Sequence, residues 1–237
     1  MIDRKLLMSR AAEAGLPMSE ATAAKFDRYA ELLVQKNEQV NLTAITDPDG
    51  ILYKHFLDSI LPLKELTLPE GASVIDVGTG AGFPGIPMKL MRPDLKLVLL
   101  DSLQKRVTVL EEFCRELELT DVTCLHARAE EAAKGNLRES FDCAVSRAVA
   151  RMNKLCEYCL PFVKVGGVFA ALKGPSAAEE NEEAAHAVSV LGGKLCPLEK
   201  VNIGGTDLCH VLAVVEKTRP TPPAYPRASG KIAAKPL

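Results

Sequence analysis

The 237-residue sequence has no uncharged apolar run that approaches the ~18 residues of a membrane span. The first segment of the sequence contains the charged residues Asp3 and Glu13 and no continuous apolar stretch, so we expect no secretory leader. An excess of one charge is also absent. The 29 basic and 31 acidic residues give a net charge of −2, which argues against a globally basic nucleic-acid-binding surface. These absences predict a cytoplasmic, globular protein without a membrane partner.

The seven cysteines lie at scattered spacings, and an odd number cannot all pair within one chain. A chain of this length does not need disulfides to fold, so reduced thiols are the better interpretation. Cys156 and Cys159 form a C-x-x-C pair, but no second ligand pair lies near them in sequence. We therefore predict no metal site.

Apolar spacing divides the chain into three predicted regions. Residues 1–70 show helical spacing, with Gly15 ending one helix, Ser19 capping a second and Asp47-Pro48 starting a third. Residues 71–217 alternate strands with helices. The expected strands are 74–77, 96–100, 122–126, 141–145, 167–172 and 211–215, and the clearest helices are 103–117 and 177–191. This order predicts an α/β fold: a doubly wound, mostly parallel, Rossmann-like sheet with an N-terminal helical extension packed on it.

Residues 218–237 form the third region and differ from the rest in composition. Counted from Lys217, this end of the chain holds five basic residues, five of the fifteen prolines and no acidic residue. Because the whole chain sums to −2, the remainder carries −7. We predict an extended basic tail here, and a local basic face on an otherwise acidic protein.

A glycine-rich segment, D-V-G-T-G-A-G-F-P-G at residues 76–85, directly follows the first predicted strand. Gly78, Gly80 and Gly82 exceed what a tight structural turn needs, and they let a ligand approach backbone N–H groups. A loop of this kind between a strand and a helix predicts a cradle for a nucleotide-like cofactor. Asp101 ends the second strand, 19 residues after Gly82, where a carboxylate can hold a ribose diol.

The glycine spacing discriminates among cofactors. Phe83 stands where the dinucleotide fingerprint has its last glycine, and G-x-G-x-G is more typical of S-adenosylmethionine enzymes. No tyrosine has the lysine four residues on that short-chain dehydrogenases use, and no phosphate-binding G-x-x-x-x-G-K-[ST] segment occurs. A nucleotide-cofactor oxidoreductase is the alternative enzyme class. A non-catalytic RNA-binding assembly factor is the alternative without chemistry.

Polar residues also follow the later strands, at Arg128-Ala129-Glu130, Ser146-Arg147 and Lys173-Gly174. Ligands of open parallel sheets bind beyond the carboxyl ends of the strands, so we expect all these groups at one edge.

Six segments carry a family resemblance. They are Asn41-Leu42-Thr43-Ala44, His55-Phe56-Leu57-Asp58-Ser59, residues 76–85, Asp101-Ser102 with Lys105-Arg106, Ser146-Arg147-Ala148, and Leu172-Lys173-Gly174. In this order they resemble the bacterial glucose-inhibited division protein B family, the 16S rRNA guanine-N7 methyltransferases, over essentially the whole chain. The resemblance implies a class I S-adenosyl-L-methionine-dependent fold. It also implies guanine 527, in the decoding-centre hairpin of 16S rRNA, as the target. The partner would be the small ribosomal subunit or its precursor, and we expect a monomer.

The resemblance assigns cofactor contacts by motif position to Gly78, Phe83, Ala129, Glu130 and Arg147. We add Gly80 and Gly82 for the methionyl part and Asp101 for the ribose. Guanine N7 has a lone pair and no proton, so its methylation needs no general base. Orientation is then the main catalytic contribution, and Arg147 is the predicted catalytic residue.

The predicted substrate-binding residues are polar or basic, and most belong to the matching segments. They are Asn41, His55, Asp58, Lys105, Arg106, Lys173 and Arg227. His55 and Asp58 lie three residues apart and so share a helix face. An alternative interpretation makes them a buried polar pair that braces this helix against the sheet.

Overall fold

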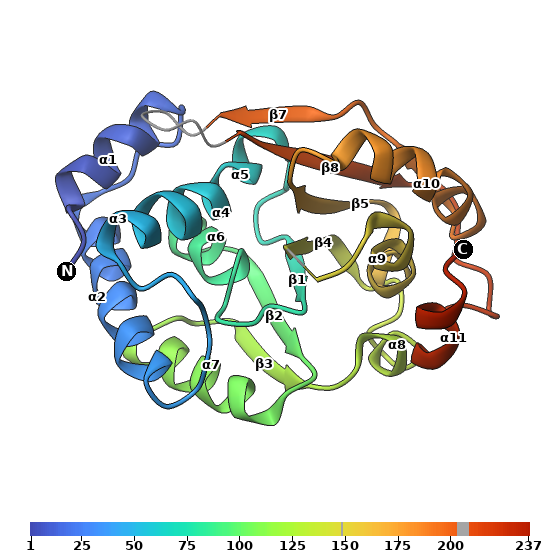
Figure 1. Ribbon diagram of the computed structural model, residues 1–237, viewed down its shortest axis with the longest axis horizontal. Coiled ribbons are helices and arrows are strands. Elements are labelled where there is room, and N and C mark those ends of the chain that lie inside the picture. Colours follow the sequence, from blue (N-terminus) through green and yellow to red (C-terminus); the bar gives the residue numbers. More distant parts are fainter. Residues whose placement is uncertain (148, 203–208) are drawn as a thin grey trace.

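The computed structural model describes residues 1–147, 149–202 and 209–237, in which the strands form one mixed sheet (Figure 1). Its order is β3-β2-β1-β4-β5-β8-β6, and β7 pairs with β8. The strands are β1 (Ser73–Val77), β2 (Lys96–Asp101), β3 (Val122–His126), β4 (Phe141–Arg147), β5 (Val163–Lys173), β6 (Gly193–Leu195), β7 (Glu199–Asn202) and β8 (Cys209–Lys217).

Strands β1 to β5 are parallel, and β8 runs antiparallel to β5. The chain reverses its direction of winding between β1 and β4, which is where ligands of such sheets bind. The predicted fold class is therefore confirmed. Because β8 is antiparallel, its first residues lie at the same edge as the carboxyl ends of the parallel strands.

The six expected strands are all present, although β5 begins four residues earlier than predicted, at Val163. The sequence patterns did not predict β6 and β7, which have only three and four residues. Such short strands give too few alternations of apolar and polar residues to be recognised.

The chain before β1 is helical, as predicted. Ser19 accepts a hydrogen bond from the Thr22 N–H at 3.1 Å, and Asp47 accepts one from Gly50 at 2.6 Å. A π-helical turn interrupts the third helix. The elements are α1 (Arg4–Glu13), α2 (Glu20–Asn37), α3 (Pro48–Gly50), the π-helical η1 (Ile51–Leu57), α4 (Asp58–Ile60) and α5 (Pro62–Glu65).

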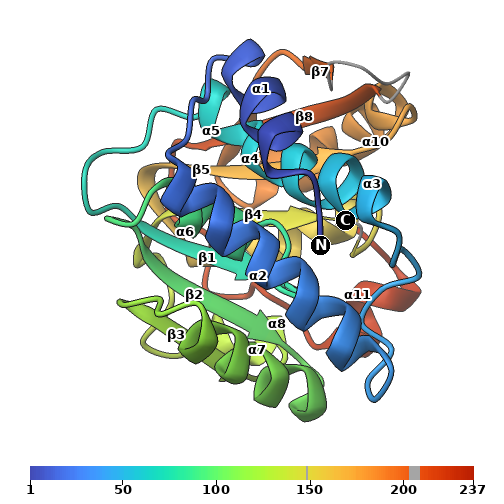
Figure 2. The ribbon, with the colours of Figure 1, turned by 90° about the vertical axis from the view of Figure 1, so that its left-hand side faces the viewer.

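Two apolar cores cover the two faces of the sheet, as the alternation in β1 illustrates: Val74 packs in one core, and Ile75 and Val77 in the other. The N-terminal helices, α6 (Gly85–Met91) and α7 (Gln104–Glu116) form the first layer. In Figure 2, α2 of this layer lies in front of the sheet, and it contacts both α6 and α7. The second layer comprises α8 (Ala129–Ala132), α9 (Met152–Cys159), the 3-10 turn η2 (Leu160–Phe162), α10 (Ala177–Val190) and α11 (Ser229–Ala234).

The prediction of an extended C-terminal tail is wrong for residues 229–234, which form α11 and contact α9. The tail prolines that precede this helix end at Pro226, so they do not prevent helix formation, and Ile232 is completely buried. None of the described helices is long and apolar enough to cross a membrane.

Candidate active site

Three adjoining cavities lie along the carboxyl edge of the sheet. The β2–β3 cavity, about 320 Å³, includes Leu100, Ala127 and Glu130 in its lining. The glycine-loop cavity, about 390 Å³, is lined by residues 78–81, Phe83 and Arg106, among others. The β5–β8 cavity, about 690 Å³, is lined on several sides by basic residues. Asp101 is shared by the first two cavities and Arg147 by the last two, while Val149 lines all three.

The glycines of the loop differ in the space that surrounds them. Gly78 and Gly80 have positive φ values of 72° and 61°, and a Cβ on Gly80 would meet no atom within 4 Å. This open side makes Gly80 part of a cradle. A Cβ on Gly82 would instead lie 2.5 Å from Ile86 and 2.7 Å from the Tyr29 hydroxyl. Gly82 is therefore needed for packing, and Tyr29 Oη donates a hydrogen bond to the neighbouring carbonyl of Ala81.

Asp76 holds the glycine loop from behind. Its Oδ2 accepts hydrogen bonds from the Thr79 hydroxyl at 2.6 Å and from the Gly85 N–H at 2.8 Å. Its Oδ1 is buried and has no hydrogen-bond partner among the described residues. Burial raises the pKa of this carboxyl to about 6, which the two hydrogen bonds only partly offset.

Asp101 is fixed between the loop and α7. One oxygen accepts from the Gly80 N–H at 3.0 Å and the other from Leu103 at 2.9 Å, while Arg106 Nη1 lies 3.5 Å away. A carboxylate offers about four acceptor sites, so this one can still accept ribose hydroxyls. The structure places Asp101 where the sequence predicted it, at the end of β2 and in the lining of two cavities.

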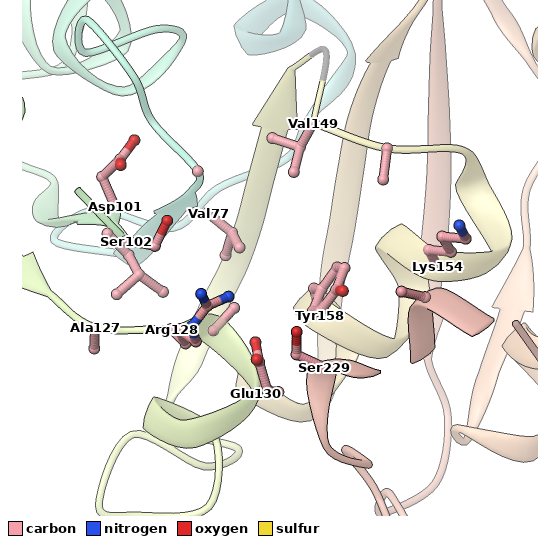
Figure 3. A pocket seen from close by; sticks show the side chains of 15 residues that line it. Val77, Asp101, Ser102, Ala127, Arg128, Glu130, Val149, Lys154, Tyr158 and Ser229 are labelled. Atoms are coloured by element: carbon pink, nitrogen blue, oxygen red, sulfur yellow. The ribbon is translucent and has the colours of Figure 1, made fainter. Parts of the chain in front are cut away.

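The β2–β3 cavity has largely apolar walls (Figure 3). Val77 and Leu100 come from strand ends and Tyr158 from α9, while Glu130 contributes a carboxylate at the start of α8. A flat, mostly apolar ring with a few polar edges suits such a slot. The open glycine cradle, the fixed carboxylate of Asp101 and this slot together fit S-adenosylmethionine.

Arg147 is held by side chains that are distant in sequence. Its Nη1 donates to Asp58 at 2.9 Å and to the Lys54 carbonyl at 3.0 Å, and its guanidinium lies 4.8 Å from the Phe83 ring centroid. Asp58 is completely buried, and its other oxygen is hydrogen-bonded to His210 Nδ1. Arg147 is therefore fixed in one orientation between the glycine-loop and β5–β8 cavities.

The pKa values of the two histidines beside Arg147 are shifted in opposite directions. Burial, together with the nearby Arg147 charge, lowers the pKa of His55 to about 4, so this imidazole is neutral near pH 7. His55 stacks on Phe83 with 4.5 Å between ring centroids, and its Nε2 is hydrogen-bonded to Thr43. The hydrogen bond to Asp58 raises the pKa of His210.

Basic side chains dominate the β5–β8 cavity. Lys54, Arg147, Arg151 and Lys173 line it, and its two carboxylates are already engaged. Asp58 binds Arg147, and Glu180 binds Lys173 at 2.7 Å. Arg151 is paired as well, with Glu183 of α10 at 2.7 Å. Three of these four cations therefore have a carboxylate partner, and the local basic face that the charge pattern predicted stays a prediction.

Most predicted site residues meet at this edge: Gly78, Gly80, Phe83, Asp101, Ala129, Glu130, Arg147, His55, Asp58, Arg106 and Lys173. Others of the described residues lie elsewhere. Asn41 is exposed in a hollow that shares Leu42 and Thr43 with the glycine-loop cavity. Lys105 lies on the outer surface of α7, and Arg227 binds Glu157. Ala148, part of the matching Ser146-Arg147-Ala148 segment, lies outside the described residues.

Sequence reasoning missed Lys54, His210, Tyr158 and Ser229 as lining residues. Lys54 directly precedes the His55 segment, so its position offered a usable indication. His210 precedes the last expected strand and would have been placed at this edge if that strand had been recognised as antiparallel.

Strand order, an antiparallel β8 and the cavity beside the glycine loop define a class I S-adenosylmethionine-dependent methyltransferase fold. Solved structures agree. TYW2 of M. jannaschii in complex with AdoMet matches with a TM-score of 0.56 and 18% identity, over 73% of this chain and 79% of that chain. A SAM-dependent methyltransferase from Aquifex aeolicus matches with a TM-score of 0.53 and 23% identity, over 77% of this chain and 97% of that chain.

Sequence relatives identify the family. The Ribosomal RNA small subunit methyltransferase G of Clostridium beijerinckii is 49% identical over 98% of both chains, and that of Alkaliphilus metalliredigens is 45% identical over 100% of both. Residues 22–208 match the family GidB, rRNA small subunit methyltransferase G. The chain belongs to this family. The resemblance is thereby confirmed, and so is S-adenosyl-L-methionine as the cofactor.

Proposed function

We propose that this protein transfers a methyl group from S-adenosyl-L-methionine to N7 of guanine 527 in 16S rRNA. Family membership supports an rRNA substrate. The observation that carries the proposal is the position of Arg147, which lines both the glycine-loop cavity and the basic β5–β8 cavity. A group held there can contact a methyl donor on one side and a base on the other.

The cofactor residues follow from the cavities. Gly78 and Gly80 present backbone to the methionyl part, Asp101 accepts from the ribose, and Ala129 and Glu130 lie at the adenine end. When bound, S-adenosylmethionine supplies a methyl group already activated by its sulfonium. Phe83 acts through its ring, on which both His55 and Arg147 stack.

The reaction requires orientation and no proton transfer from the base, because guanine N7 carries a lone pair and no hydrogen. His55 fits this chemistry, since both of its ring nitrogens lie within hydrogen-bond distance of protein partners, at 2.8 Å from Thr43 and 3.3 Å from Arg147. Arg147 has donors beyond those used by Asp58, and it can direct one to a carboxylate or to an acceptor of the guanine edge. Positioning of this kind contributes roughly 7–11 kcal/mol in favourable cases.

The β5–β8 cavity is the place for the target base. Bases that undergo chemistry leave the helical stack and enter a pocket, and flanking phosphates bind basic side chains. Lys54 is exposed at this cavity and suits that role, whereas Arg151 is bound to Glu183 at 2.7 Å. Lys105 and Arg106 extend the basic surface along α7. Lys173, already bonded to Glu180 and the Ala150 carbonyl, shapes the cavity wall. The partner is the small subunit or its precursor, met by a monomer in the cytoplasm.

A synthetic decoding-centre hairpin, 16S rRNA and small subunits should each be incubated with the protein and methyl-labelled S-adenosylmethionine. We expect one label per hairpin at guanine 527, mapped by mass spectrometry of ribonuclease fragments. A matched hairpin with 7-deazaguanosine at this position should take no label, because its N7 is replaced by C–H. Labelling of the deaza hairpin would contradict N7 as the acceptor. RNA binding without labelling would favour a non-catalytic assembly factor. Binding of a dinucleotide but not of S-adenosylmethionine would favour an oxidoreductase.

A further inference from the structure

The segment that follows β8 is bonded to the body of the protein. Arg138 donates hydrogen bonds to the carbonyl of Thr221 at 2.6 Å and to that of Tyr225 at 2.8 Å. Ile232, on the inner side of α11, is completely buried. These contacts fix the path of the chain up to and into α11.

The strongest of these attachments is an ion pair between Arg227 and Glu157 of α9. Arg227 donates its backbone N–H at 2.8 Å, its Nε at 2.9 Å and its Nη2 at 2.6 Å to the two carboxylate oxygens. The Glu157 side chain is completely buried, so the pair is a charge-assisted, two-pronged contact shielded from water. The charge of Arg227 is thus matched within the protein.

This attachment brings α11 to the β2–β3 cavity. Ser229 and Ala233, one turn apart, line the cavity together with Tyr158 of α9. Figure 3 shows Ser229 near Glu130 and Tyr158, across the cavity from Asp101. The strand ends of β1 and β2 form the opposite side, so the cavity needs α11 to be closed on this side.

We propose that α11 is a wall of the cofactor site, in which Ser229 and Ala233 contact the adenosine part of S-adenosylmethionine. The C-terminal segment thereby sets cofactor affinity. The inference rests on the cofactor and its cavity, and it does not depend on which base is methylated. It replaces the expectation that Arg227 binds RNA.

The test is isothermal titration of the full chain with S-adenosylhomocysteine, which binds without turnover. Ala233→Trp fills the cavity and should weaken binding at least tenfold. Ala234→Trp is the matched control, because Ala234 is the next residue of the same helix, is exposed and is not part of the described cavity lining; it should stay within twofold. A double variant, Lys231→Ala with Lys235→Ala, should also stay within twofold.

Unchanged affinity of a folded Ala233→Trp variant would overturn the proposal, and so would equal weakening by both tryptophans. Circular dichroism melting establishes folding. If Ala233→Trp does not fold, Ala233→Leu is compared with Ala234→Leu in the same titration. The proposal then requires Ala233→Leu to weaken S-adenosylhomocysteine binding at least threefold more than Ala234→Leu does. Failure of the proposed rRNA reaction would instead appear as no labelling by the unaltered chain, whatever these titrations show.

Discussion

The two outer cavities of the carboxyl edge differ in what builds them. The β2–β3 cavity consists largely of residues that directly follow strands, and its walls are mostly apolar. Its charged lining residues are two carboxylates, Asp101 and Glu130, and two cations, Arg128 and Lys154. The β5–β8 cavity combines side chains from segments far apart in sequence, joined by hydrogen bonds around Asp58. The strand ends thus supply most of the cofactor slot, which α9 and α11 close, whereas the basic cavity also needs the N-terminal helices to be docked on the sheet.

The comparison also explains why net charge was a poor guide to partners. The overall −2 averages a local surplus of basic groups at one cavity with the acidic surface elsewhere. Four basic side chains and two engaged carboxylates line the β5–β8 cavity, and Glu183 of α10 binds one of these basic groups, Arg151, at 2.7 Å. An enzyme that must release its RNA after each reaction needs only such a local surplus, because a long phosphate footprint slows dissociation.

The largest effect on stability should come from His55. Its pKa is lowered from 6.5 in the unfolded chain to about 4 in the folded protein, so the unfolded state binds a proton first as pH falls. Stability is full above pH 6.5 and decreases towards pH 4, by about 3 kcal/mol at pH 4 from this group. Urea unfolding at pH 6.5 and at pH 4 measures this loss of unfolding free energy. In the His55→Asn variant the loss should be smaller by about 3 kcal/mol. An equal acid loss in both proteins would contradict the burial argument.

Arg147→Lys should lower turnover about 100-fold, since it keeps the charge opposite Asp58 but loses the planar fork that orients the reactants. Single-turnover methyl transfer to the hairpin measures this effect. The melting temperature should change little, because Asp58 keeps a cationic partner. Arg147→Ala is a poorer choice, since it removes the charge opposite a buried carboxylate. Turnover of the lysine variant close to that of the unaltered protein would remove Arg147 from the reaction.

Asp101→Asn should weaken cofactor binding and leave RNA binding unchanged. Losing a charged acceptor for ribose hydroxyls costs about 1.4 kcal/mol, or roughly tenfold in cofactor affinity. Titration with S-adenosylhomocysteine measures it, and binding of the hairpin to the cofactor-free protein should be unaffected. A parallel decrease in RNA affinity would show that the two cavities are not separate in function.

The smallest effect is expected for Lys54→Ala. Loss of one phosphate contact should weaken hairpin binding about threefold and reduce the slope of log affinity against log salt by about 1. Lys64→Ala removes an exposed lysine of α5 that is not among the described lining residues, and it is the matched control. Equal slopes for both variants would place the RNA on another surface.

Local spacing correctly predicted where the glycine loop and Asp101 lie, because a glycine loop and a strand-end acid at fixed separation follow from the strand–helix–strand unit. It could not predict the contacts of Arg147. The hydrogen bonds to Asp58 and the Lys54 carbonyl span about ninety residues and depend on how η1 and α4 dock. At the C-terminus the composition led to the wrong prediction of an extended tail, because the proline-rich, basic segment still buries Ile232 and forms a helix.

The hydrogen bond from Tyr29 to the Ala81 carbonyl has a consequence for cooperativity. It joins α2 to the glycine loop across 52 residues, and Tyr29 also packs against Phe83 and Phe113. The loop therefore cannot open locally without disturbing the buried face of α2. In native-state hydrogen exchange, the amides of α2 and of the segment after β1 should exchange as one unit, so the first helices belong to the same folding unit as the cofactor loop.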